Sequence, residues 1–288
     1  MPEETVIPVP PALASGALVD AARHRAMTEE ARRDPEGFWR KEMRRIAWMK
    51  EPTRIKNVSF SGDVSIRWFE DGVLNASVSC LDRHIESGKG DRVAIVFEGD
   101  DPNTDAKVTY RELHRRVCQL ANAMRGMGVK KGDRVCIYLP MIVEAAVAML
   151  ACARVGAIHS IVFGGFSPDS LAGRIADCDA CAVITADEGL RGGKTIPLKR
   201  NVDEALAQGN VGTVIVVTRT GADVPMKDGR DISYSAVRDT LSTQCAAEMM
   251  DAEDPLFILY TSGSTGKPKG VVHTTGGYAV WASATFDW

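Results

Sequence analysis

Residues 255–270 read PLFILYTSGSTGKPKG, an apolar run that passes directly into small and basic residues. The composition of residues 255–260 is typical of a buried strand. Glycines in the following segment permit positive φ angles and a close approach of the backbone, so its N–H groups can turn toward an anion. Hydroxyl groups add donors and two lysines add positive charge. We therefore predict a phosphate-binding loop that consists of Thr261, Ser262, Gly263, Ser264, Thr265, Gly266, Lys267 and Lys269.

This loop differs from the P-loop of nucleoside triphosphatases. The P-loop motif has four residues between its first glycine and a Gly-Lys pair, and Ser or Thr follows the lysine. Here two residues separate Gly263 from Gly266, and Lys267 is followed by Pro268. The structural alternative, a flexible surface loop, is disfavoured because an apolar strand leads into a run of small residues with two lysines. We therefore expect a phosphate loop of another kind.

Upstream of the loop, from about residue 91, short β-branched runs alternate with helical stretches. The runs predict strands at residues 92–98, 134–139, 157–162, 182–185, 213–218 and 256–260. Apolar periodicity predicts helices at residues 109–127, 142–154, 167–176 and 202–207. Apolar strands that alternate with helices indicate an α/β fold whose mostly parallel sheet is flanked by helices and buried on both faces.

The first 90 residues follow another pattern. Residues 1–19 are rich in Pro, Ala and Val without periodicity, which is typical of a loosely ordered arm. Asp34-Pro35 has the form of a helix start, with Asp as the cap and Pro at the first helical position. We therefore divide the chain into an amino-terminal arm and helical segment, residues 1–90, and the first part of an α/β domain, residues 91–288.

Composition excludes several classes of protein. The net charge of -3 gives no electrostatic reason to expect nucleic acid as a partner. The seven cysteines are odd in number and several lie in apolar runs, which is typical of reduced cysteine in a cytoplasmic protein. The acidic amino terminus disfavours a secretory signal. Glu144 and Arg154 interrupt the longest apolar stretch, so we predict no membrane-spanning helix.

At residues 261–270 the chain resembles the adenylate-forming superfamily, which includes acyl-CoA synthetases, luciferases and peptide-synthetase adenylation domains. Three further stretches resemble acetyl-CoA synthetases: WFEDGVLN at 68–75, CLDRH at 80–84 and IVFGGFS at 161–167. The similarity runs from about residue 30 to the end of the chain. It implies that the chain is a truncated part of the large amino-terminal domain of such an enzyme, without the rest of that domain and the small carboxy-terminal domain.

The resemblance implies an acetate–CoA ligase that works in two steps. Acetate attacks the α-phosphorus of ATP, which gives acetyl-adenylate and diphosphate, and the thiol of coenzyme A then displaces AMP. Mg²⁺ accompanies ATP, and the loop holds the β- and γ-phosphates. The resemblance also implies that Arg191, Gly192, Gly193 and Lys194 contact coenzyme A, with Phe163, Gly164 and Gly165 near its nucleotide end. It assigns no catalytic residue and no metal ligand to this chain.

Two other functions stay open. A propionyl-CoA or other short-chain acyl-CoA synthetase fits equally well, because the acyl-pocket residues of the family lie beyond Trp288. The chain is alternatively a catalytically inactive fragment that at most binds ligand, because the family brings its adenylation lysine from the carboxy-terminal domain. An exposed sheet edge predicts that the isolated chain aggregates. The sequence has no signature of an oligomeric state.

Three smaller patterns favour structural roles. Cys178 and Cys181 have redox spacing but no histidine near in sequence, so inert packing is the preferred interpretation. The run Asp82-Arg83-His84 allows a catalytic dyad, yet a helix end that fixes the amino-terminal segment to the core is the better hypothesis. His273 follows the phosphate loop without a general-base partner in the sequence.

Overall fold

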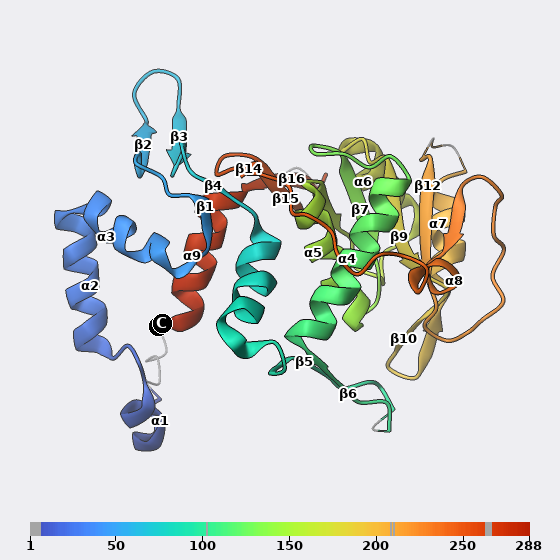
Figure 1. Cartoon of the computed structure of the whole chain (residues 1–288), viewed down its shortest axis with the longest axis horizontal. Helices are drawn as coiled ribbons and strands as arrows, with labels where there is room; N and C mark the ends of the chain where they lie inside the picture. The colour runs from blue at the N-terminus through green and yellow to red at the C-terminus, as the bar shows by residue number, and fades with distance from the viewer. Residues whose placement is uncertain (1–6, 102, 208, 210, 263–266) are drawn as a thin grey trace, which may run out of the picture.

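The computed structural model describes residues 7–101, 103–207, 209, 211–262 and 267–288, and a seven-stranded sheet forms its centre (Figure 1). Every neighbouring pair in this sheet is parallel except the last, β15 with β16. The predicted α/β fold with a mostly parallel sheet is therefore confirmed. The order across the sheet is β13 (Asp231–Ser233), β12 (Thr213–Val217), β9 (Ala182–Ala186), β7 (Arg134–Tyr138), β8 (Ile158–Ile161), β15 (Pro255–Thr261) and β16 (Lys269–Thr274).

Helices cover the central strands, which explains why these strands are apolar along their whole length. All five residues of β9 are buried, as are four of the five in β7 and in β12. One helical layer contains α4 (Tyr110–Gly126), α5 (Val143–Val155) and α8 (Tyr234–Arg238), and a second contains α6 (Pro168–Asp177) and α7 (Leu198–Ala205). A sheet buried on both faces needs this cover. In contrast, β16 is mostly exposed, with 55% of Val272 accessible to solvent.

Several helices begin where the sequence supplies a capping side chain. Thr109 Oγ1 accepts a hydrogen bond from the Glu112 N–H at 3.2 Å at the start of α4. Asp34 Oδ1 accepts one from the Gly37 N–H at 2.9 Å and precedes α3 (Pro35–Glu42), which confirms the predicted Asp-Pro start. Such caps satisfy donors that have no partner within the first turn.

The structure corrects three expectations. The strand predicted at 92–98 is β5 (Val93–Phe97), but it pairs with β6 (Ala106–Thr109) in a separate antiparallel ribbon and not with the main sheet. Val93 and Val96 are exposed and no residue of β5 is fully buried, so this strand does not need the cover that the main sheet has. Helix α7 begins at Leu198, four residues before the prediction, because Leu198 and Lys199 are both buried. The amino-terminal arm contains a short helix, α1 (Pro11–Gly16), that buries no residue.

A second, smaller core joins the amino-terminal segment to the last helix, α9 (Thr275–Asp287), as the adjacent blue and red elements of Figure 1 show. Its buried residues are Met43, Ile46, Ile55, Phe69, Leu74, Ala252 and Val280. The elements around it are α2 (Ala21–Arg33), η1 (Met43–Arg45), the three-stranded sheet of β1 (Trp48–Lys50), β4 (Val73–Leu74) and β14 (Met250–Asp251), and the hairpin of β2 (Lys56–Ser59) and β3 (Ser65–Trp68). Residues far apart in the sequence thus share this core.

A largely buried ion pair ties the amino-terminal segment to the main core. Two π-helical turns, η2 (Val78–Asp82) and η3 (Ile85–Lys89), connect the two parts of the chain. Asp82 accepts two hydrogen bonds from Arg154 on α5, at 2.9 and 3.0 Å. Loss of one partner from such a pair costs about 3–5 kcal/mol, because the other charge stays uncompensated. His84 does not pair with Asp82 but packs against Tyr110, with ring centroids 4.7 Å apart. The interpretation that residues 82–84 fix the amino-terminal segment to the core is therefore confirmed.

His114 on α4 extends this ion pair. Its Nε2 lies 3.4 Å from Asp82 Oδ1, and its ring lies 3.7 Å from Cys118 Sγ. The hydrogen bond to Asp82, together with the contact to Cys118, raises the pKa of His114 to about 9. Burial by itself would raise the pKa of Asp82, but the hydrogen bonds from His114 and Arg154 hold that pKa well below its usual range.

We predict that the free energy of unfolding decreases as the pH rises from 6.5 to 9. The pKa of His114 is higher in the folded chain than in the unfolded chain, so its stabilising charge is fully present below about 6.5 and is lost as pH rises to about 9. Urea unfolding across this range measures the slope. His114→Gln should flatten it, whereas His24→Gln on the exposed helix α2 should not. An unchanged slope in His114→Gln would contradict the assignment.

Candidate functional site

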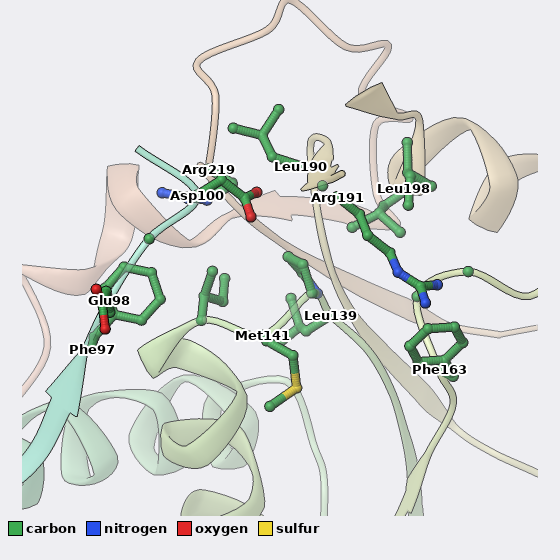
Figure 2. A pocket seen from close by; sticks show the side chains of 17 residues that line it. Phe97, Glu98, Asp100, Leu139, Met141, Phe163, Leu190, Arg191, Leu198 and Arg219 are labelled. Atoms are coloured by element: carbon green, nitrogen blue, oxygen red, sulfur yellow. The ribbon is translucent and has the colours of Figure 1, made fainter. Parts of the chain in front are cut away.

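The carboxyl ends of the parallel strands all meet at one edge of the sheet. From β7 the chain passes to β8 on one side and then to β9 on the other, so the order of the strands reverses at β7. In open α/β sheets, ligands bind in the crevice outside the carboxyl ends at such a reversal. A cavity of about 250 Å³ lies there, lined by residues that follow β5, β7, β8, β9 and β12 (Figure 2).

A two-residue hairpin carries the predicted Arg-Gly-Gly-Lys motif. Strands β10 (Gly189–Arg191) and β11 (Lys194–Ile196) are antiparallel, and Arg191 is directly opposite Lys194. Gly192 has φ 55° and Gly193 has φ 72°. A tight hairpin turn of this type needs positive φ at both central positions, which explains the glycine pair. The two glycines thus act through the shape of the turn, and of the four motif residues only Arg191 lines the cavity.

Arg191 points from the hairpin toward the residues that follow β8 (Figure 2). Its guanidinium carbon lies 4.7 Å from the centroid of the Phe163 ring, within the range of a cation–π contact. A Cβ atom on Gly165 would come within 2.6 Å of that ring and 3.1 Å of Arg191 Nη1, so a larger residue there would displace the Phe163–Arg191 pair. The structure therefore brings together the two sequence motifs that resemble coenzyme A contacts.

The predicted phosphate loop connects β15 to β16. Thr261 and Lys269 form the last residue pair of this antiparallel hairpin, and Ser262 and Lys267 are exposed beside them. Gly263, Ser264, Thr265 and Gly266 lie outside the described residues. A strand follows the loop, whereas a helix follows a P-loop, so the predicted distinction from P-loop proteins is confirmed. Because β15 pairs with β8, the loop lies at the same edge as the cavity.

Two residues of the cavity region were not predicted from the sequence. Asp187, which is 3% exposed, follows β9 and accepts hydrogen bonds from the N–H groups of Glu188, Arg219 and Gly221 at 2.7–2.8 Å. Arg219 follows β12, and its guanidinium carbon lies 5.7 Å from the Phe97 ring centroid. The partners are more than 30 residues apart in sequence, so no local pattern identifies them.

The other residues that the sequence offered as candidates, the cysteine pair and His273, have surroundings that favour structural roles. Desolvation raises the pKa of both the buried Cys178 and the exposed Cys181, which disfavours the reactive thiolate, but of the two only Cys178 packs in the core. His273 on β16 stacks on Phe257, with ring centroids 4.4 Å apart. Among the helices that the structure describes, none combines the length and the apolar character that a membrane crossing requires.

Comparison with known proteins establishes the family. Residues 81–287 match the family of AMP-binding enzymes, and this match covers more than half of the chain. The chain therefore belongs to the AMP-binding enzyme family. Residues 24–80 match a second family, the acetyl-coenzyme A synthetase N-terminus. The resemblance to acetyl-CoA synthetases that the sequence motifs indicated is thereby confirmed.

Individual relatives agree with this assignment. The chain is 61% identical to the acetyl-coenzyme A synthetases of Parvibaculum lavamentivorans and Caulobacter vibrioides, over 99% and 98% of its own length. It spans 44% of the length of each of these curated relatives. The structure of acetoacetyl-CoA synthetase from Streptomyces lividans is similar with a TM-score of 0.81 and 28% identity, over 95% of this chain and 41% of that one.

We predict that Gly193→Ala frays the hairpin of β10 and β11. An alanine at φ 72° costs roughly 1 kcal/mol, because its Cβ crowds the backbone. Amide hydrogen exchange should therefore accelerate in residues 189–196. The matched control is Gly173→Ala within α6, where the added Cβ meets no atom within 4 Å and alanine favours the helix. Unchanged exchange in Gly193→Ala would contradict the role of the turn.

Proposed function

We propose that this chain is the amino-terminal portion of an acetate–CoA ligase. The enzyme converts acetate, ATP and coenzyme A into acetyl-CoA, AMP and diphosphate through an acetyl-adenylate. The observation that best supports the proposal is that the predicted phosphate loop and the Arg-Gly-Gly-Lys hairpin lie at one edge of the sheet in a chain that is 61% identical to acetyl-coenzyme A synthetases. The proposal includes the division at residue 90 and a cytoplasmic location.

The loop from Thr261 to Lys269 would hold the β- and γ-phosphates of ATP. Thr261 and Ser262 supply hydroxyl donors at the end of β15, and Lys267 and Lys269 supply positive charge at the start of the returning strand. When acetate attacks the α-phosphorus, negative charge builds up on the departing diphosphate. Fixed donors and cations stabilise this charge without reorganisation during the reaction.

The hairpin would hold the nucleotide end of coenzyme A. Arg191 offers a guanidinium group whose orientation is fixed by the Phe163 ring, and guanidinium groups bind phosphate with two hydrogen bonds. Gly165 has no side chain that would displace the Phe163 ring or the Arg191 guanidinium group, so this pair can lie close to the backbone at the cavity. Lys194 adds positive charge at the outer side of the turn.

Mg²⁺ belongs to the proposal as the counterion of ATP. The described residues contain no cluster of three or more His, Cys, Asp and Glu side chains that could hold a metal ion. We therefore assign no residue of this chain to the metal. ATP and coenzyme A enter the proposal as substrates, without nucleic acid or membrane as partners.

We predict that the isolated 288-residue chain catalyses no acetate-dependent exchange between ATP and diphosphate, because it spans less than half of the relatives' length. A full-length protein that contains this chain and has the length of the relatives should catalyse the exchange. It should prefer acetate to propionate by about 10-fold or more in kcat/KM, because one methylene group in a fitted pocket has this effect. Steady-state kinetics with both acids measure the ratio.

Each alternative has its own result. A clear preference for propionate would replace the proposal by the second candidate, a short-chain acyl-CoA synthetase. Exchange by the isolated chain at an ordinary enzymatic rate would contradict its predicted inactivity. A full-length protein without exchange, prepared in a folded state with ATP and Mg²⁺ present, would overturn the ligase proposal itself.

A further inference from the structure

The cavity at the carboxyl edge has a second cation. Arg219 lines it from the loop after β12, opposite the side that holds Arg191 and Phe163 (Figure 2). The side chain is half-buried. Among the described residues, no acidic group forms an ion pair with Arg219, and no hydrogen bond from its guanidinium group is present. A half-buried arginine without an acidic partner retains its full capacity to bind an anion.

The backbone fixes the position of Arg219. Its N–H donates to Asp187 Oδ1 at 2.8 Å, and the next residues, Thr220 and Gly221, donate to Asp187 Oδ2 at 3.2 and 2.8 Å. The carboxylate thus clamps three successive amides of the loop after β12. Because Asp187 is almost completely buried at the end of β9, the loop is anchored to the central sheet. Arg219 therefore enters the cavity from a defined point.

The two arginines have matching environments. Arg191 lies over Phe163 at 4.7 Å and Arg219 lies over Phe97 at 5.7 Å, so an aromatic ring restrains each guanidinium group. The two pairs occupy opposite sides of the same cavity (Figure 2). This arrangement suits a ligand with two separate anionic groups.

We propose that Arg219 binds a second phosphate group of the nucleotide whose first phosphate group is held at Arg191. The ligand class is an adenosine with phosphates on both the 3′ and the 5′ positions, as at the nucleotide end of coenzyme A. This inference rests on the proposed function, which places coenzyme A at the Arg191 hairpin. Glu98 and Asp100 also line the cavity, but both are exposed at its rim, where solvent screens their charge.

Isothermal titration calorimetry of the 288-residue chain with adenosine 3′,5′-bisphosphate and with AMP tests the proposal. The unaltered chain should bind the bisphosphate about 10-fold or more tightly than AMP, because a charge-assisted hydrogen-bonded pair has this effect. Arg219→Gln should reduce that preference to within about 2-fold and leave AMP affinity unchanged. Arg219→Lys should keep part of the preference, and Arg191→Gln should weaken the binding of both nucleotides.

The matched control is Arg200→Gln, an exposed arginine on α7 that pairs with Glu204 and does not line the cavity. It should bind as the unaltered chain does. A bisphosphate preference that persists in Arg219→Gln, or that is absent from the unaltered chain, would overturn the inference. Circular dichroism confirms that each variant is folded, and the full-length protein that carries the chain replaces it in the titrations if the isolated chain aggregates. The lysine variant provides an independent test if the glutamine variant unfolds.

Failure of the Arg219 inference can be distinguished from failure of the ligase proposal. Acetyl-CoA synthesis by the full-length protein, combined with a preference that Arg219→Gln leaves intact, would refute the role of Arg219 alone. A preference that disappears in Arg219→Gln, in a full-length protein that makes no acetyl-CoA, would refute the ligase proposal and retain the bisphosphate site.

Discussion

The parallel pairing of β7 with both β8 and β9 is the constraint on which the site depends. Cys136 on β7 lies opposite Ser160 on one side and Val183 on the other, so both neighbours run in the direction of β7 and end near its carboxyl end. Parallel strands release their loops at one edge, and here the loops carry Phe163 and Arg191. Residues almost 30 positions apart in the sequence therefore come into contact. An antiparallel pairing would have sent one of these loops to the opposite edge.

Buried charged groups hold the loops and the peripheral segments in place around the sheet. Asp187 anchors the loop after β12, and the Asp82–Arg154 pair anchors the amino-terminal segment. On α7, Lys199 is fully buried, with Nζ 2.7 Å from Asp203 and 2.9 Å from Asp231. This links the helix to the strand β13 at the sheet edge. Each of these groups is compensated, so its burial rigidifies the structure without an isolated charge.

Local patterns were enough to predict most of the fold. The main-sheet strands predicted from apolar runs and the helix starts predicted from Thr109 and Asp34 agree with the structure, because burial and capping act within a few residues. The strand at Val93–Phe97 was also predicted, but its exclusion from the main sheet was not, since pairing partners are a matter of tertiary structure. The same limit explains why the start of α7 was predicted too late. Its first turn contains Lys199, which looks polar in the sequence, and the burial of this lysine depends on its distant partner Asp231.

The candidate site was predictable only where its residues are neighbours in the sequence. The phosphate loop is continuous in sequence, so its composition indicates it, and the Arg-Gly-Gly-Lys turn was predicted from the resemblance to acetyl-CoA synthetases. Arg219 and Asp187, in contrast, are identified by contacts across more than 30 residues. The role of each site residue stays a prediction. What the structure adds is the place where the motifs converge, a single edge of one sheet.

Hydrogen–deuterium exchange of the full-length protein that carries this chain, with coenzyme A, measures this convergence most directly. We predict that saturating coenzyme A slows exchange in peptides that cover residues 163–166, 189–194 and 218–221, which follow the carboxyl ends of β8, β9 and β12. Peptides at the opposite edge, such as residues 129–133 before β7, should exchange as in the free chain. Slower exchange at residues 129–133, with none at the carboxyl edge, would contradict the account.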